Sequence, residues 1–269
     1  MTASQTRRID ARTVPRAFDD HAASYDKLVG ANPGYHDHLR LSVERMGLPD
    51  LDRDGGRGLR LLDVGCGTGA STAALLAVAP EAEIVAVDAS QEMLGAAQRK
   101  TWPDTVRFVH GNAQNLAAVG VTGPFDGILA AYLVRNLPSP DPALRQFLTM
   151  LRPGAPLAVH DYSVRDSTRS KAVWTAVCWT IIIPLGRLRT GSTGLYRYLW
   201  RSVLRFDGVS TLAQRLRDAG FVDVRCQTFP GWQQNVVHTV LGRRKPEPEV
   251  APAPVEAAEL DTPPAGLPL

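Results

Sequence analysis

Cysteine and net charge are both scarce in this sequence. Its 269 residues include three cysteines, Cys66, Cys178 and Cys226, which lie far apart in the chain. Such an odd and scattered set indicates neither a disulfide framework nor a zinc site, and we expect no bound metal. The formal net charge of +3 is too small to argue for a nucleic-acid partner.

Long apolar runs are also missing. The longest uncharged run, Ala172 to Gly186, is shorter than the roughly 20 residues that a helix needs to cross a bilayer. The first residues lack an apolar signal region. Hydrophobic residues make up 44% of the chain and charged residues 21%, which is ordinary for a globular protein. We therefore expect a cytoplasmic protein.

The segment from Leu59 to Asp88 organises the rest of the chain. It reads as a short apolar strand, a glycine-rich turn, an alanine-rich helix and a second apolar strand that ends in an acidic residue. The turn contains Gly65, Gly67 and Gly69, where glycine lets the backbone turn sharply and approach a ligand. A carboxylate at Asp88, about 20 residues after the turn, is placed to bind the hydroxyls of a nucleotide ribose.

Two cofactors compete for this segment. The spacing of Gly65, Gly67 and Ala70 fits the dinucleotide fingerprint, so NAD has to be considered. Asp63, however, lies two positions before the first glycine, where its negative charge opposes a pyrophosphate and suits a cationic amino group. S-adenosylmethionine carries an amino group, a sulfonium and a ribose but no phosphate. The sequence therefore favours S-adenosylmethionine over NAD.

The remainder of the chain predicts an α/β fold with a mostly parallel sheet. Further strands are expected at 106–109, 125–131 and 156–160, alternating with helices, and an antiparallel hairpin is expected at 221–225 and 235–241. Asn112 directly follows the third strand, on the side where ligands bind in open α/β sheets. We therefore expect Asn112 to pair with the adenine, against the alternative of a simple turn asparagine.

Four regions are expected around this fold. Residues 1–13 form a flexible N-terminus, and residues 14–58 form helices that either pack on the core or cover the cofactor as a lid, with Tyr25 facing the site. The domain that binds S-adenosylmethionine spans 59–244 and includes an insert at about 164–206. That insert, rich in aromatic residues and arginine, is expected to cap the carboxyl edge of the sheet and hold an apolar substrate pocket. Residues 245–269 are rich in proline and alanine and should be disordered.

The motif D-V-G-C-G-T-G resembles motif I of the class I S-adenosylmethionine-dependent methyltransferases. Four further segments resemble the ubiquinone and menaquinone biosynthesis C-methyltransferases: the opening V-P-R-A-F-D-D-H-A-A-S-Y-D, then L-V-R-N-L, L-Y-R-Y-L and L-A-Q-R-L-R-D-A-G-F. The resemblance runs from about Val14 to Leu241. It implies a Rossmann-like fold with seven strands, an antiparallel C-terminal hairpin and a helical cap.

The resemblance also implies roles for single residues. Thr72, Asp88, Asn112 and Ala113 would contact S-adenosylmethionine, together with Ala89 beside them, and Arg135 and Asn136 would lie near the reacting ring. Two departures fall in the substrate pocket. Asp161-Tyr162-Ser163 replaces a glutamate-phenylalanine-serine triplet, and Ala131-Tyr132-Leu133 replaces serine-phenylalanine-glycine. These departures do not affect the assignment of the methyl donor, but they affect the identity of the methyl acceptor.

The expected reaction is C-methylation of a reduced, prenylated quinol or a related phenolic ring. Arg135 would stabilise the developing phenolate, or would polarise a water molecule that removes the proton, with Asn136 orienting it. His160, Asp161 and Tyr25 are alternative proton acceptors. The other candidates are an O-, N- or C-methyltransferase of secondary metabolism and a cofactor-binding subunit without activity. Several arginines could hold the cap against the inner membrane face or simply face solvent. They are Arg187, Arg189, Arg197, Arg201 and Arg205.

Overall fold

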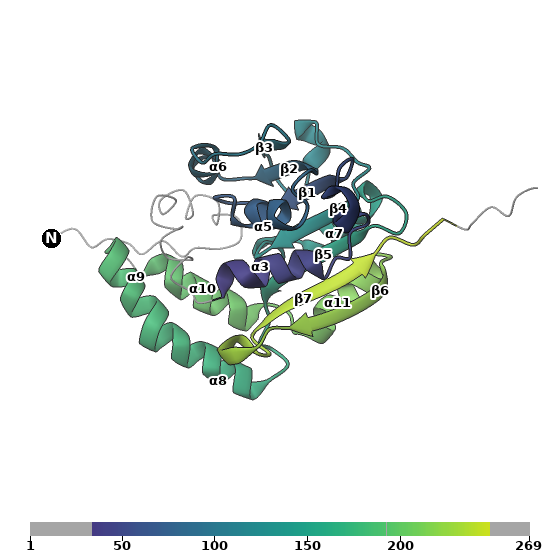
Figure 1. The fold of residues 1–269 in the computed structure, drawn as a ribbon. Coiled ribbons are helices and arrows are strands. Elements are labelled where there is room, and N and C mark those ends of the chain that lie inside the picture. The colour runs from purple at the N-terminus through teal and green to yellow at the C-terminus, as the bar shows by residue number, and fades with distance from the viewer. Residues whose placement is uncertain (1–33, 192, 248–269) are drawn as a thin grey trace, which may run out of the picture.

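The computed structural model describes residues 34–191 and 193–247, and a seven-stranded sheet lies at its centre (Figure 1). The strand order is β3-β2-β1-β4-β5-β7-β6. Five strands pair in parallel: β1 (Arg60–Val64), β2 (Glu83–Asp88), β3 (Val106–His110), β4 (Gly127–Ala131) and β5 (Pro156–Tyr162). Strand β7 (Val237–Arg243) is antiparallel to β5 and to β6 (Val222–Thr228). The predicted fold class is confirmed.

Helices cover both faces of the sheet, so β1, β2, β4 and β5 are buried along almost their whole length while successive side chains alternate between two cores. Leu61 faces a core that it shares with α3 (Tyr35–Glu44) and α5 (Ala70–Val78). Its neighbour Leu62 faces the opposite core, which contains side chains of α7 (Pro140–Met150) and α11 (Val209–Asp218). Helix α6 (Gln91–Gln98) packs beside Ala86 of β2, and Ser90 caps it by accepting a hydrogen bond from the Met93 N–H. Short segments complete the described fold: α4 (Leu51–Asp54), η1 (Leu116–Val119), η2 (Val134–Asn136) and η4 (Gly231–Gln233).

The strand order creates a switch point beside β1. The chain moves from β1 to β2 on one side and later to β4 on the other, so the carboxyl ends of these strands diverge around a crevice. The turn after β1, Asp88 at the end of β2 and the segment after β4 all meet at this edge. The fold thus brings together three segments that the sequence singles out.

The insert between β5 and α11 is helical and lies at the same edge (Figure 1). A single helical run consists of α8 (Thr168–Val177), a π-helical turn η3 (Cys178–Ile182) and α9 (Ile183–Thr190), and α10 (Gly194–Arg205) packs against it. Gly186 permits this packing, because a Cβ there would lie 2.2 Å from the ring of Tyr196. Trp174 is fully buried against the ring of Tyr162 on β5, with centroids 4.7 Å apart.

The expectation that no segment is long enough to cross a membrane was wrong. Thr168–Leu188 is one helical stretch of 21 residues with mean hydropathy 1.2, which meets the requirement by length and composition alone. The uncharged run from Ala172 to Gly186 underestimated the length of this helix. The helix begins earlier, at Thr168, and continues past the run to Leu188. Only 22% of its most apolar window is buried.

Two further expectations concern the two ends of the chain. The helix expected from Val14, and Tyr25 with it, lies outside the described residues. The predicted C-terminal hairpin is present, but its connection contains η4, and β7 begins at Val237 because Asn235 adopts a left-handed conformation with φ of 59°. A sequence pattern does not show that β7 also pairs with β5.

Candidate active site

The turn after β1 is shaped by three glycines with positive φ. Gly65, Gly67 and Gly69 have φ values of 77°, 55° and 90°, a region that other L-residues rarely adopt. A Cβ on Gly67 would meet only the Met93 methyl group, at 3.9 Å, whereas a Cβ on Gly69 would lie 2.7 Å from the Trp102 ring. Gly67 therefore leaves room for a ligand, and Gly69 leaves room for a core side chain.

Asp88, at the end of β2, is held by two backbone amides. Its Oδ2 accepts a hydrogen bond from Gly67 N and its Oδ1 accepts one from Ser90 N, each at 2.8 Å. The carboxylate thus fixes the glycine turn against the start of α6. A carboxylate oxygen can accept more than one donor, so this arrangement presents Asp88 in a defined orientation to vicinal hydroxyls.

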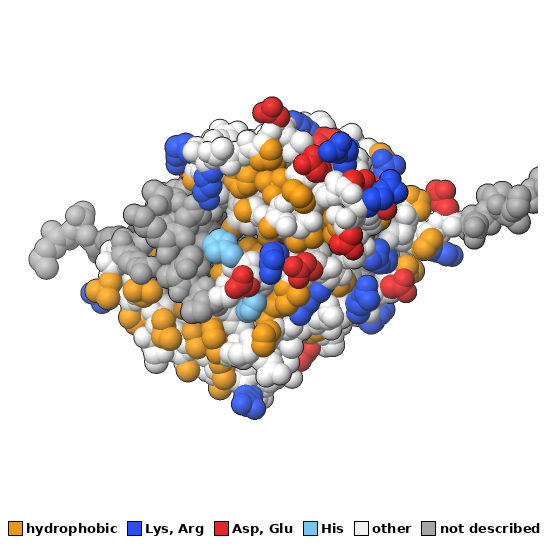
Figure 2. Space-filling view, viewed as in Figure 1, with side chains coloured by type: hydrophobic (Ala, Val, Ile, Leu, Met, Phe, Trp, Pro, Cys, Tyr) orange, Lys and Arg blue, Asp and Glu red, His pale blue; other side chains and the backbone are white. Residues whose placement is uncertain are grey.

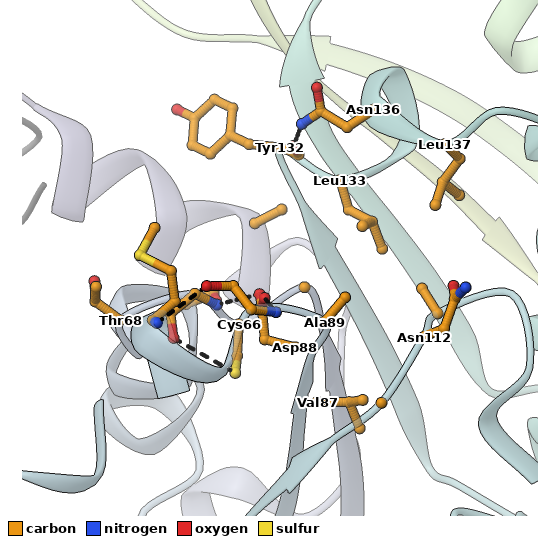
Figure 3. Close-up of a pocket in the computed structure, with 18 of the residues that line it drawn as sticks. Cys66, Thr68, Val87, Asp88, Ala89, Asn112, Tyr132, Leu133, Asn136 and Leu137 are labelled. Carbon is orange, nitrogen blue, oxygen red and sulfur yellow. Dashed lines mark hydrogen bonds between the residues drawn. The ribbon is translucent and has the colours of Figure 1, made fainter. Parts of the chain in front are cut away.

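A cavity of about 390 Å³ opens between these elements. Figure 3 shows Asp88 and Ala89 on one side and Leu133, Asn136 and Leu137 across from them. Asn112 lies at the rim, and its Oδ1 accepts a hydrogen bond from Gln114 N at 2.9 Å, which orients the amide. The cavity is large enough for a small-molecule site and is continuous from the glycine turn to the segment after β4.

Most of the predicted site residues line this cavity, but some do not. Those that do are Gly65, Gly67, Asp88, Ala89, Asn112, Ala113, Arg135 and Asn136. Asp63, Gly69 and Thr72 do not line it, because they lie behind the turn, and Tyr25 lies outside the described residues. Of the two segments expected in the substrate pocket, Ala131-Tyr132-Leu133 lines the cavity and Asp161-Tyr162-Ser163 does not. Sequence reasoning missed several other lining residues, among them Tyr35, Ser90, Met93 and Pro138.

Asp63 is fully buried beneath the turn. Its Oδ2 accepts hydrogen bonds from Ser71 Oγ at 2.8 Å and Thr72 Oγ1 at 2.7 Å, while its Oδ1 has no hydrogen-bond partner among the residues that the structure describes. Burial raises the pKa of Asp63 to about 7, against the opposing effect of the two hydroxyls. A buried carboxylate of this kind fits a cationic ligand such as S-adenosylmethionine, which would favour the ionised form.

This environment predicts that cofactor binding depends on pH. The positive charges of S-adenosylmethionine stabilise ionised Asp63, so binding releases a proton and the affinity should rise about tenfold between pH of about 6 and 8. Calorimetry in two buffers of different ionisation enthalpy would count the proton. Asp63→Asn keeps the acceptor for Ser71 and Thr72 but cannot titrate. It should therefore remove this rise and leave only the titration of the ligand's own amino group; the same pH dependence in both proteins would contradict the linkage.

Tyr132 begins the wall opposite the glycine turn in an unusual backbone conformation. Its φ is 55°, although it is not glycine, and its carbonyl oxygen accepts hydrogen bonds from Asn136 Nδ2 at 2.9 Å and Arg135 Nη1 at 3.2 Å. Its N–H donates to the carbonyl of His160 at 2.7 Å. The Tyr132 ring stacks on Tyr35 of α3, with centroids 5.5 Å apart and planes at 8°. Local hydrogen bonds and stacking therefore hold a strained residue at the cavity.

Arg135 forms a buried ion pair with Asp161 of β5. The Nη1 to Oδ1 distance is 3.0 Å, and the two side chains are 4% and 1% exposed. Burial raises the pKa of Asp161, and the neighbouring Arg135 opposes this rise. Arg135 thus lines the cavity while its charge is balanced from behind, which suits stabilisation of a negative charge that develops in front of it.

Asn136 links the cavity to the cap. Its Oδ1 accepts a hydrogen bond from the hydroxyl of Tyr198 on α10 at 3.0 Å. The two residues are 62 positions apart in sequence, and no local pattern predicts the contact.

His160 has a fixed tautomer in a buried network. Ser42 Oγ donates its only proton to the His38 carbonyl at 2.8 Å, so His160 Nδ1, at 2.7 Å from Ser42 Oγ, has to be the donor of that pair. His160 Nε2 then accepts the hydroxyl proton of Tyr132 at 3.0 Å. Burial lowers the pKa of His160 to about 3. His160 is also absent from the lining of the cavity, so it is poorly placed to take a proton from a substrate there.

Comparison with known proteins gives a consistent result. The model of the ubiE/COQ5 methyltransferase family matches residues 6–240. A ubiquinone/menaquinone biosynthesis C-methyltransferase of Bradyrhizobium diazoefficiens is 34% identical over 182 residues, covering 66% of this chain and 71% of the relative. A demethylmenaquinone methyltransferase of Staphylococcus aureus is 29% identical over 223 residues, covering 81% and 88%.

Solved structures share the fold at lower sequence identity. Phosphoethanolamine N-methyltransferase 2 of Haemonchus contortus, in complex with S-adenosyl-L-methionine, matches with a TM-score of 0.60 and 15% identity. The match covers 90% of this chain and 61% of that one. At this identity the likeness concerns the architecture, which is the one described above.

Proposed function

Because this chain belongs to the ubiE/COQ5 methyltransferase family, we propose that it methylates a ring carbon of a reduced, prenylated quinol or a related phenol. It is an S-adenosylmethionine-dependent methyltransferase, and the cofactor supplies an activated methyl group when bound. The observation that carries the proposal is the single cavity, in which Asp88 and Asn112 lie on one side and Tyr132, Arg135 and Asn136 on the other.

The cofactor half of the cavity would hold the nucleoside. Asp88 would bind the ribose hydroxyls, and Asn112 and Ala113 would lie against the adenine. Gly65 and Gly67 would let the backbone approach the amino-acid part, above the buried charge of Asp63. These roles are supported by the lining of the cavity for all but Asp63, which would act through the turn.

The acceptor half would hold an aromatic ring. Tyr35 and Tyr132 provide stacked aromatic walls, and Leu133, Leu137 and Pro138 add apolar surface. A quinol ring becomes nucleophilic when a hydroxyl loses its proton, and Arg135 would stabilise the resulting phenolate. Arg135 itself cannot accept the proton, because a guanidinium stays protonated.

The buried candidates are poorly placed to receive this proton. His160 and Asp161 do not line the cavity, and both oxygens of Asp161 already accept hydrogen bonds from Arg135 or the Tyr162 N–H. Tyr25 remains a proposed acceptor. A water molecule that Asn136 and Arg135 orient is the alternative.

We also propose how the enzyme meets its acceptor. A prenylated acceptor is a lipid, so peripheral contact with the inner membrane face would serve a cytoplasmic enzyme of this kind. The cap helices would cover the acceptor, since α10 already bonds to Asn136 through Tyr198.

The decisive experiment is an incubation of the full chain with S-adenosylmethionine and a panel of reduced polyprenyl quinols and simple phenols. We expect mass spectrometry to locate one added methyl group on a ring carbon, and no product from the oxidised quinones. A methyl group on oxygen or nitrogen would favour an enzyme of secondary metabolism instead. Cofactor binding without product from any acceptor would favour a non-catalytic subunit.

A further inference from the structure

We propose that the outer face of Thr168–Leu188 is a docking surface for an anionic lipid bilayer. Apolar side chains gather along this edge of the molecule, over α8 and α9 (Figure 2). Trp179, Ile181 and Leu188 are 45%, 56% and 84% exposed, and Ala172 and Pro184 of the same run are also exposed. An apolar surface that continues along a helix is unusual on a protein that faces only water.

The opposite face of the same run belongs to the protein core. Trp174, Cys178 and Ile183 are buried, and Trp174 Nε1 donates a hydrogen bond to the Trp200 carbonyl at 3.3 Å. A helix that spans a bilayer would have to leave this core, and the cavity left by a side chain as large as Trp174 costs several kcal/mol. The helix therefore lies flat in the interface, with its outer face toward the acyl chains.

Charge identifies the partner. From Ser167 to Phe206 the sequence has no aspartate or glutamate, although it has seven cationic residues: Arg169, Lys171, Arg187, Arg189, Arg197, Arg201 and Arg205. A second copy of the chain would bring an identical cationic segment against this one in a symmetric contact, which is repulsive. A surface of anionic lipid headgroups attracts it.

The aromatic residues at the edge of this surface support an interfacial position. The rings of Trp179 and Trp200 meet edge to face at 5.5 Å, and the Arg197 guanidinium lies 5.6 Å from the Trp179 ring centroid. Tryptophan and arginine both place an apolar part toward lipid and a polar part toward the headgroups.

Docking in this orientation places the cap between the bilayer and the cavity. Helix α10 packs against the docking helix and bonds to Asn136 at the cavity through Tyr198. A prenylated acceptor could then reach the cavity past the cap without crossing bulk water. This purpose depends on the proposed function, whereas the docking itself does not.

The test is flotation of the full chain with vesicles of phosphatidylcholine alone or mixed with phosphatidylglycerol. We expect binding to the mixed vesicles that weakens as salt is added. Ile181→Ser and Leu188→Ser should each lower the partition coefficient about tenfold, and Arg187→Gln about fivefold. The matched control is Arg107→Gln, which removes an exposed charge from the edge strand β3. This change should leave the partition coefficient unaltered.

A second readout reports depth. Brominated lipids should quench the fluorescence of Trp179 in the native chain, and the extent of quenching should fall in Trp179→Phe. The affinity for the cofactor should be the same in both proteins. No binding to anionic vesicles would overturn the proposal. Self-association that the Ile181→Ser and Leu188→Ser changes abolish, without vesicle binding, would also overturn it. Vesicle binding in a protein that methylates no acceptor would contradict the proposed function and leave docking supported.

Discussion

Asp88→Ala should weaken S-adenosylmethionine binding by roughly a hundredfold or more. In the proposed role the carboxylate accepts hydrogen bonds from both ribose hydroxyls, and losing two charge-assisted hydrogen bonds would cost about 3 kcal/mol. It also anchors Gly67 N and Ser90 N, so the turn itself would loosen. Calorimetric titration with the cofactor measures the effect. Glu83→Ala, at the exposed start of the same strand, is the control and should bind normally.

The two contributions of Asp88 can be separated chemically. A 2′-deoxy analogue of the cofactor lacks one ribose hydroxyl and should bind the native protein more weakly than the parent compound. If the carboxylate binds the ribose, Asp88→Ala should bind both ligands about equally. If removing the ribose hydroxyl weakens binding to Asp88→Ala as much as it weakens binding to the native protein, Asp88 only supports the turn.

Arg135→Met should destabilise the fold and slow turnover. The change leaves Asp161 buried without its cation, which costs about 3 to 5 kcal/mol of unfolding free energy. Asp161→Asn in the same chain removes the unbalanced carboxylate, so the double variant should regain most of that loss in denaturant unfolding. Arg152→Met is the control, because its ion pair with Asp126 is partly exposed, at 53% and 17%, and should matter by no more than about 1 kcal/mol.

Kinetics of the double variant then tests the chemistry without the stability defect. If Arg135 stabilises the developing phenolate, kcat should fall about a hundredfold while cofactor affinity changes little. Near-native kcat in a folded Arg135→Met/Asp161→Asn protein would show that the pair is structural. Equal losses of kcat and cofactor affinity would instead assign Arg135 to cofactor binding.

The cofactor half of the site was readable from sequence because its signals are local. Three glycines within five residues, and a carboxylate at the end of the next strand, determine a turn and a strand end that any parallel pairing places together. The same reasoning expected Gly69 and Thr72 at the cavity, which they do not line. Successive residues at the start of α5 point in different directions, and the sequence does not show which of them face the cavity. Gly69 faces Trp102, and Thr72 faces Asp63.

The acceptor half was only partly readable, because its contacts join distant segments. Arg135 and Asn136 were expected near the ring, but the left-handed turn at Tyr132 and the stacking on Tyr35 were not. The pairing of Tyr132 with His160 depends on the alignment of β4 beside β5, and the Tyr198 bond depends on how the cap folds back. Neither has a periodic signature in the sequence.

The insertion of β7 between β5 and β6 has a consequence for synthesis of the protein. The five parallel strands are continuous without β7, but β6 joins the sheet only when β7 arrives, because β6 pairs only with β7 among the described strands. Arg243, at the end of β7, also donates hydrogen bonds to the Met46 and Gly154 carbonyls. A nascent chain that stops short of Val237 would therefore leave one edge of β5 and both edges of β6 unpaired, and the arrival of β7 would be the step that joins them.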